Sequence, residues 1–233
     1  MNLIAVTHGA LHPAGTRTID AVVDRVRHRL PGIAVRSAYL GLGRPLLADV
    51  LVEDPGPAIV VPLLLTAAGS AGQSAPGLGL PDGTYTVAGP LGPDRLLAEV
   101  VQQRLSEAGV RPGQPVILVA AGSPDAATHG DTARSAGLLA EAWGGPVRAA
   151  HLTGSGPRMS EVAASFRAQG MAPPAVAPYL IAPGHHYRKA REDARSLGLG
   201  TVAEPLGDHP LVAEAVVQRY RAAAARRFAL SLR

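Results

Sequence analysis

The chain has 233 residues, of which 47% are hydrophobic and 17% are charged, a balance typical of a globular protein rather than a disordered one. Its formal net charge of +4 favours an anionic small molecule as ligand. Nucleic acid is not expected as a partner, because aromatic residues make up only 3% of the chain and no continuous Lys/Arg stripe forms. The absence of cysteine excludes disulfides, thiolate metal sites and a cysteine nucleophile, so any metal chemistry must use His, Asp or Glu.

The sequence contains no apolar run of the roughly 18 residues that a membrane-spanning helix needs. The first residues are predicted to form a strand rather than a signal peptide, because a basic segment and a small-residue cleavage site are both missing. We therefore expect no membrane partner and a cytoplasmic location. Either a monomer or a homodimer is compatible with the sequence.

The first half of the chain alternates predicted strands and helices. Its first strand, residues 3–9, carries apolar residues suited to burial on both faces and ends in His8 and Gly9. The further elements predicted in this half are helix 15–30, strand 33–40, helix 45–52, strands 58–65 and 84–88, and helix 93–108.

The second half shows the same order of elements. Its predicted elements are strand 116–120, helix 125–143, strand 147–152, helix 157–168, strands 176–181 and 201–203, and a long helix 209–230. Such a run of strand–helix units predicts an α/β protein whose parallel sheets are covered by helices on both faces.

The two halves also align with each other. Residues 5–9 align with 118–122, residues 61–65 with 177–181, and residues 89–93 with 204–208. Copies of about 115 residues are too long for a solenoid repeat and suit two doubly wound lobes. We therefore predict two similar lobes, residues 1–111 and 112–233, related by a pseudo-twofold repeat, with a central cleft between them as the usual place for a ligand.

The alignment indicates which histidines could work together. His8 follows the first strand of the first lobe, and its counterpart in the second lobe is Ala121. After the third strand the second lobe carries His185 and His186, and His186 aligns with Ser70. Each lobe thus offers one imidazole, a group that binds first-row metals and accepts protons near neutral pH. The alternative interpretation of the second-lobe pair is a polar helix start whose rings only cap or contact solvent.

Other polar and glycine-rich stretches give weaker indications. His12 could support His8 or be an exposed loop residue, and His151 could edge the cleft or lie in the core. The glycine-rich stretch 69–83 is interpreted as a flap over the cleft, with a phosphate-binding loop as the alternative, although it matches neither known phosphate-binding motif. The histidines interpreted as surface residues are His28, His129 and His209.

Several short motifs resemble, in order, the long two-lobed form of the sirohydrochlorin chelatase family, the CbiX and SirB type of class II chelatase. They are Thr-His-Gly at 7–9, Ala-Tyr-Leu at 38–40, Val-Pro-Leu-Leu-Leu at 61–65, Gly-Pro-Leu-Gly-Pro-Asp at 89–94, Ala-Ala-Gly-Ser at 120–123, Tyr-Leu-Ile-Ala-Pro-Gly at 179–184 and Pro-Leu-Gly-x-His-Pro at 205–210. The resemblance covers essentially the whole chain.

This resemblance implies two flavodoxin-like, chelatase-like lobes and the insertion of Fe(II) or Co(II) into sirohydrochlorin, towards sirohaem or a cobalamin precursor. On this basis His8 and His186 would be the catalytic residues, and both with His185 would bind the metal, Zn or Ni being further possible ions. The polycarboxylate tetrapyrrole would be held by basic and small residues near loop ends. The candidates are Gly9, His12, Arg17, Arg44, Ser70, Arg158, Arg188 and Lys189.

Two departures from the family pattern change the expected site. The family histidine after the third strand is replaced by Ser70, and the family glutamate after Ala-Tyr-Leu is replaced by Gly41. We expect His186 to compensate from the second lobe if its loop faces His8. The alternative function is a non-catalytic or repurposed tetrapyrrole- or metal-binding protein on the same fold.

Overall fold

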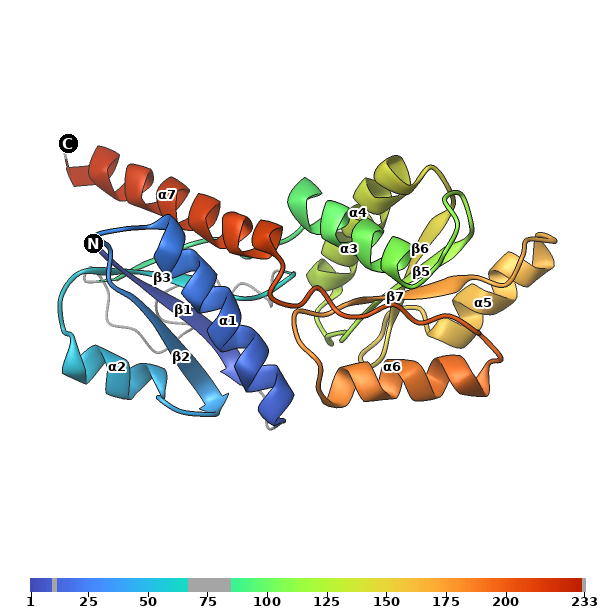
Figure 1. Cartoon of the computed structure of the whole chain (residues 1–233), viewed down its shortest axis with the longest axis horizontal. Helices are drawn as coiled ribbons and strands as arrows, with labels where there is room; N and C mark the ends of the chain where they lie inside the picture. The colour runs from blue at the N-terminus through green and yellow to red at the C-terminus, as the bar shows by residue number, and fades with distance from the viewer. Residues whose placement is uncertain (10–11, 67–84, 232–233) are drawn as a thin grey trace. The chain divides into compact units, whose positions relative to one another are not determined.

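The computed structural model describes residues 1–9, 12–66 and 85–231, which form two compact units. Unit 1 combines Met1–Leu91 with Asp208–Arg233, and unit 2 consists of Gly92–Gly207. Each unit is a parallel sheet with helices on both faces (Figure 1). The predicted α/β class with two similar parallel-sheet lobes is therefore confirmed.

Unit 1 is built on a four-stranded parallel sheet with strand order β2-β1-β3-β4. Its strands are β1 (Asn2–Gly9), β2 (Val35–Leu42), β3 (Ala58–Pro62) and β4 (Tyr85–Val87), and its helices are α1 (Pro13–Arg29), α2 (Leu47–Glu53) and α7 (Pro210–Ser231). Helices α1 and α7 lie together on one face of this sheet and α2 lies on the other (Figure 1).

The central strands of unit 1 are buried on both faces, which explains their nearly continuous apolar sequence. Alternate side chains such as Ile4 and Val6 pack with Leu47 and Val50 of α2. Their neighbours Leu3 and Ala5 are equally buried and, by the alternation of a strand, point to the face that α1 and α7 cover.

Unit 2 repeats this plan with a three-stranded parallel sheet of order β6-β5-β7. Its strands are β5 (Val116–Ala120), β6 (Val147–His151) and β7 (Ala175–Tyr179), and its helices are α3 (Arg95–Glu107), α4 (Ala126–Trp143), α5 (Met159–Ala168) and α6 (His185–Ser196). The predicted strand 201–203 is reduced to one parallel bridge between Val176 and Val202.

The helices of unit 2 cover the two faces of its sheet in pairs. Ile117, Val119 and Val176 of the sheet form one core cluster with residues of α5 and α6, including Phe166 and Ala190. Helices α3 and α4 pack against each other and against the sheet, α4 on β5 and β6 and α3 on β7 (Figure 1).

The compact units do not coincide with the predicted segments 1–111 and 112–233, because two helices are exchanged between them. Helix α3 follows the first repeat in sequence but packs on α4 and β7 of unit 2, and α7 ends the second repeat but packs on α1, β3 and β4 of unit 1. The pattern of apolar residues determines that a helix forms, but it does not determine which sheet the helix covers.

Hydrogen bonds fix the exchanged helices in their units. The Arg104 guanidinium of α3 donates to the Leu206 carbonyl at 3.0 Å. The Arg219 guanidinium of α7 donates to the carbonyls of Pro90 and Leu91 at 2.7 and 2.8 Å. Leu91 and Leu206 are themselves fully buried, so the segments that lead into α3 and α7 are both anchored.

Helix α6 was not predicted as an element, although the polar helix start proposed for His185 and His186 is found there. Only Tyr187, Ala190 and Ala194 of this helix are buried. The remaining positions are mostly charged, so the apolar periodicity is too weak to indicate a helix.

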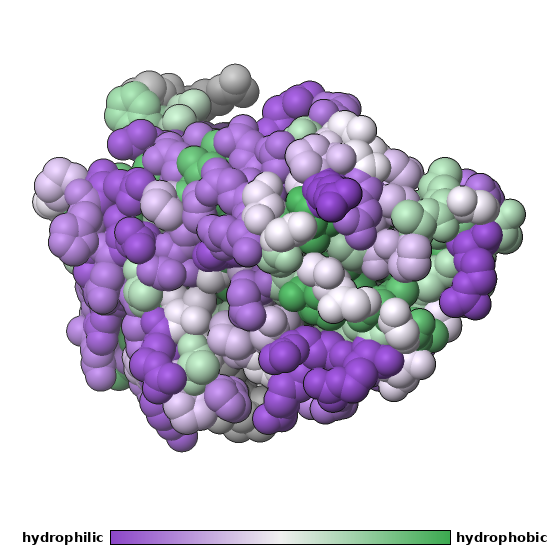
Figure 2. Space-filling view, turned by 45° about the vertical axis from the view of Figure 1, so that its right-hand side comes forward, coloured by the Kyte–Doolittle hydropathy of each residue, from purple (hydrophilic) through white to green (hydrophobic). Residues whose placement is uncertain are grey.

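No helix in the described parts of the chain is both long enough and apolar enough to cross a membrane. Exposed large apolar side chains are few among the described residues, and Figure 2 shows that apolar surface occurs in patches among polar residues. Most large apolar side chains therefore lie in the core and most charged ones on the surface, as in a globular protein.

The exchange of helices predicts which fragment folds alone. A fragment of residues 92–207 contains the whole of unit 2, whereas a fragment of 112–233 lacks α3 and carries α7 without its sheet. Loss of α3 removes the buried Leu97, Val101 and Leu105, each worth about 1.5–3 kcal/mol of burial, so we expect 112–233 to be unfolded or only partly folded.

The measurement is thermal unfolding followed by fluorescence of Trp143, the only tryptophan of the chain, which is buried in unit 2. We expect a cooperative transition for fragment 92–207 and a shallow or absent one for 112–233. Equal cooperativity of the two fragments would show that α3 is not part of the folding unit.

Candidate functional site

In both units the carboxyl ends of parallel strands meet at one edge of the sheet, where α/β proteins usually bind ligands. In unit 1 this edge carries His8 and Gly9, the last two residues of the central strand β1. His8 is exposed, so its imidazole is available to solvent and ligand. The predicted position of His8 at the end of a buried strand is thus observed.

An irregularity in strand pairing lies at His8. Thr7 pairs with Tyr39 and Gly9 pairs with Leu42, so two residues of β2, Leu40 and Gly41, oppose the single residue His8. This two-against-one arrangement is that of a β-bulge, and bulges are common next to active sites because they redirect side chains. The backbone at His8 therefore departs from the regular ladder at the point where chemistry is expected.

Gly41 leaves space beside His8 that a larger residue could occupy. Among the described residues, a Cβ atom at Gly41 would have one close neighbour, the His8 carbonyl oxygen at 3.8 Å. This is ordinary van der Waals contact, and the φ angle of Gly41 does not require glycine. The position that carries a carboxylate in the family pattern is therefore sterically open here.

Gly43, by contrast, is required by the local structure. Its φ angle is +133°, and a Cβ atom there would come within 2.7 Å of the Tyr39 ring. The turn after β2 is therefore packed closely on the buried Tyr39, and it leads to the exposed Arg44. Arg44 forms an ion pair with Asp49 of α2 at 3.5 Å, so its charge is already partly offset.

His12 has a local structural role in unit 1. It is the N-cap of α1, and its Nδ1 accepts a hydrogen bond from the Ala14 backbone N–H at 3.3 Å. This bond occupies the lone pair of Nδ1 and leaves Nε2 as the protonated nitrogen of the neutral ring. His12 can still donate to a ligand, but its Nδ1 is not a free metal ligand. Ser70 and the glycine-rich stretch 69–83 lie outside the described residues.

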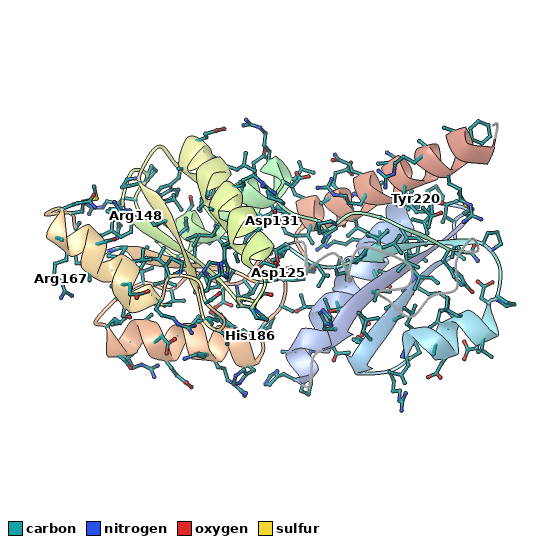
Figure 3. All side chains as sticks on the ribbon, turned by 180° about the vertical axis from the view of Figure 1, so that it is seen from behind. Asp125, Asp131, Arg148, Arg167, His186 and Tyr220 are labelled. Carbon is teal, nitrogen blue, oxygen red and sulfur yellow. The ribbon has the colours of Figure 1, made fainter. Side chains whose placement is uncertain are left out.

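In unit 2 the corresponding edge carries Ala121 after β5 and the paired histidines after β7. His185 and His186 are the first two residues of α6, and their ring centroids lie 5.6 Å apart in an edge-to-face arrangement. Figure 3 shows His186 at this end of α6. The two imidazoles are thus brought together as neighbours at the helix start.

The protonation state of His186 favours a ligand role. Partial burial lowers the pKa of His186 below the ordinary value of histidine, and the adjacent His185 lowers this pKa further. At neutral pH the ring is therefore uncharged, which is the form that binds a metal ion or accepts a proton. His186 retains exposed surface, so a ligand can reach it.

Two further predicted substrate-binding residues follow on the same helix. Arg188 is exposed, and the Lys189 ammonium donates to both carboxylate oxygens of Asp193 at 3.0 Å. The ion pair fixes the direction of the lysine side chain but offsets its charge. Of these two side chains, Lys189 is therefore the more precisely positioned.

His151 of unit 2 lies in the core, one of the two placements expected for it, but its contact with His129, which was interpreted as a surface residue, was not predicted. The His151 ring is only 2% exposed and its centroid lies 4.7 Å from that of His129 on α4. Nε2 of His129 lies 3.2 Å from the Ser123 carbonyl oxygen, whereas neither ring nitrogen of His151 has a hydrogen-bond partner among the described residues. A Cβ atom at Gly156 would collide with the His151 ring, so only glycine fits there.

Strand alternation explains the burial of His151. Its neighbours Ala150 and Leu152 belong to the core on the α5 and α6 side, so His151 points to the opposite face, beneath α4. Burial and the charges of His129 and Arg158 lower the pKa of His151, whose ring is neutral at pH 7. The alternation could have identified this placement from the sequence, but not the partner His129.

The predicted residues do not form a complete metal site within the described parts of the chain. Among residues 1–9, 12–66 and 85–231, no group of three His, Asp or Glu side chains is arranged to hold a metal ion. His8 belongs to unit 1 and His186 to unit 2. Their joint action on one metal ion therefore stays a prediction.

Comparison with known families gives a match in each half of the sequence. The sequence profile of the CbiX family matches residues 2–108 and again residues 115–223. The two matches together cover most of the chain, and the gap between them falls at the junction of the two repeats. A search of curated protein sequences finds no significant match.

Solved structures share the fold along their whole length. SirB from Bacillus subtilis with Fe3+ superposes with a TM-score of 0.80 at 22% identity, covering 98% of both chains. The sirohydrochlorin chelatase SirB from Bacillus subtilis subspecies spizizenii in complex with cobalt gives 0.73 at 20% identity, covering 97% of this chain and 96% of the other. CbiX, described as the terminal enzyme of siroheme biosynthesis in denitrifying bacteria, gives 0.68 at 18%, covering 96% and 99%.

The lowered pKa of His151 predicts that unit 2 loses stability in mild acid. The folded unit keeps this imidazole neutral, so below about pH 6.5 the unfolded chain binds a proton that the folded chain does not, and the free energy of unfolding falls. Thermal unfolding followed by Trp143 fluorescence between about pH 7 and pH 5 measures the effect. In His151→Leu the decrease should be smaller.

The matched control is His185→Leu, which removes an exposed histidine of the same unit. It should keep the part of the acid sensitivity that comes from His151. If His151→Leu loses as much stability between about pH 7 and pH 5 as the wild-type protein, the acid sensitivity comes from other groups.

Proposed function

Because the chain belongs to the CbiX family, we propose that it is a sirohydrochlorin chelatase, a lyase that inserts Fe(II) or Co(II) into the tetrapyrrole sirohydrochlorin. The proposed product is sirohaem or a precursor of cobalamin. The observation that carries the proposal is His8, an exposed imidazole at the bulged end of β1 in a chain whose two halves both match the family.

The chemistry of metal insertion needs groups that these residues supply. The pyrrole nitrogens must lose two protons, and the metal ion must lose part of its water shell. A neutral imidazole can accept a proton or replace one water ligand, and both Fe(II) and Co(II) accept imidazole nitrogen. We assign these roles to His8 and His186, with His185 as a further metal ligand. In this proposal Zn(II) or Ni(II) can occupy the same ligands.

The carboxylates of sirohydrochlorin require donors around the site. We assign this role to small, polar and basic residues near the ends of strands and helices. The exposed guanidinium groups of Arg44 and Arg188 suit bidentate contacts with carboxylates, and the Lys189 ammonium suits a single contact. The complete set proposed for substrate binding is Gly9, His12, Arg44, Ser70, Arg188 and Lys189.

A second candidate function is favoured by the open space at Gly41. The missing carboxylate beside His8 removes a group that could accept a pyrrole proton or attract the metal ion. A protein that binds a tetrapyrrole or a metal ion without inserting the metal would keep the fold and lose this group. Tight binding without turnover is the result that would favour this alternative.

The first test of the proposal is metal insertion into sirohydrochlorin by His8→Ala and His186→Ala. If each imidazole transfers a proton or delivers the metal, each substitution should lower the rate by about 100-fold. Absorbance changes of the tetrapyrrole with Fe(II) and with Co(II) give the rates. His28→Ala, which removes an exposed histidine of α1, serves as the matched control and should keep full activity.

The double variant tests whether the two histidines act on one metal ion. If they do, the rate of the double variant His8→Ala/His186→Ala should fall by less than the product of the two single fold-decreases. The reason is that either single substitution already impairs the step in which both histidines take part. Wild-type protein that gives no rate above the spontaneous reaction would reject the enzymatic proposal.

The second test restores the missing carboxylate. Gly41→Glu places a carboxylate next to His8 in a position without steric conflict, so we expect metal insertion to rise by about 10-fold or more. Gly41→Gln has nearly the same size without the charge and is the matched control. An equal response to both variants would show that the charge at residue 41 is not used.

A further inference from the structure

A surface pocket in unit 2 contains two of the basic residues named as substrate-binding candidates, Arg158 and Lys189, but the pocket itself has not yet been given a ligand. It has a volume of about 450 Å³ and lies at the carboxyl end of β6, between the first residues of α5 and the side of α6. This volume is within the range of small-molecule sites. The walls combine Arg158, Lys189 and Asp193 with an apolar floor that includes Leu152 and Met159.

The guanidinium of Arg158 is held in place by backbone carbonyls. It donates to the His151 carbonyl at 3.3 Å and to the Gly154 carbonyl at 2.7 Å. Two of its five N–H groups are thus used, and three are left for another acceptor. No carboxylate of the described residues forms an ion pair with Arg158, so its positive charge is not neutralised.

The other charged groups of the pocket offset each other. Lys189 forms an ion pair with Asp193 at 3.0 Å, and both residues line the pocket. Two cations and one carboxylate leave a net charge of +1 on the lining, which is the charge of Arg158. The nearby carboxylate of Glu161 accepts the backbone N–H of Arg158 at 2.7 Å and is not part of the lining.

The floor of the pocket is the edge of the unit 2 core. Leu152 and Met159 are buried members of the core cluster, and Leu197 packs against it. A short aliphatic segment would contact the partly buried Leu197 and the small exposed edges of Leu152 and Met159, while one negative charge would balance Arg158. These two requirements together describe a carboxylate on a short aliphatic chain.

We propose that this pocket binds a carboxylate on a short aliphatic stem, with Arg158 as its charged partner and Leu152 and Met159 as its apolar floor. Two sources share this chemistry. One is a carboxylate side chain of the tetrapyrrole, an assignment that rests on the proposed function, and the other is a free short-chain carboxylic acid.

The test uses the intact protein labelled with ¹³C at its methionine methyl groups. The chain has three methionines, so the spectrum contains three signals, of which Met159 reports on the pocket. We expect butanoate to shift the Met159 signal with a dissociation constant of about 1 mM, and the uncharged butanamide to leave it unshifted. The signals of Met1 and Met171 are internal controls.

Substitution of Arg158 makes the test specific. Arg158→Ala keeps the backbone N–H that Glu161 accepts and should weaken butanoate binding by about 10-fold or more, and Arg158→Lys should weaken it less. The matched control is Arg167→Ala, at the opposite end of α5 (Figure 3), which should bind like the wild-type protein. Unchanged thermal unfolding followed by fluorescence of the buried Trp143 establishes that unit 2 of each variant is folded.

The proposal is overturned if butanoate leaves Met159 unshifted, if butanamide shifts it equally, or if Arg158→Ala binds as well as wild type. The kinetics of metal insertion decide whether the bound carboxylate belongs to the tetrapyrrole or to a free acid. A KM for sirohydrochlorin raised about 10-fold in Arg158→Ala, at an unchanged kcat, assigns the pocket to the tetrapyrrole. An unchanged KM assigns the bound carboxylate to a free acid. If the wild-type protein has no chelatase activity, the dissociation constants of wild type and Arg158→Ala for sirohydrochlorin decide the source in the same way, because binding does not depend on turnover.

Discussion

Parallel pairing of strands buried on both faces is the constraint on which the rest of this structure depends. In both units the central strand, β1 or β5, is flanked by strands on each side and covered by helices on both faces. A strand in this position must be apolar along its length, so polar chemistry is confined to the end where the strand leaves the sheet. His8 lies at that end in unit 1, and Ala121 takes the corresponding place in unit 2.

The repeats have diverged in chemistry while keeping this plan. Unit 1 has a histidine at the strand end and a glycine, Gly41, beside it. Unit 2 has no histidine directly after β5 but carries an imidazole pair at the start of α6 and another pair, His129 and His151, beneath α4. The surroundings of the rings also differ, because His8 is exposed to solvent, whereas His151 is only 2% exposed and its ring packs on that of His129.

The sequence predicts the strands and most helices because each depends on a local pattern of apolar residues. It does not predict the helix exchange, because α3 and α7 present apolar faces that either sheet could cover. The bulge at His8 depends on the pairing register, which one strand alone does not contain. The pocket beside Arg158 forms between α5 and α6, which are distant in sequence, so the sequence does not predict it. Helix α6 was not predicted because only three of its residues are buried and its apolar periodicity is weak.

The exchange of helices also sets how the two units are joined. The chain passes from one unit to the other twice, after Leu91 and after Gly207, and both crossings occur within the same repeated Pro-Leu-Gly segment. In each segment the buried leucine donates its N–H to the loop that follows the third strand, Leu91 to Leu64 and Leu206 to Leu180. The chain thus crosses between the units at the two corresponding Pro-Leu-Gly segments of the repeat, and a buried leucine anchors each crossing to its own unit.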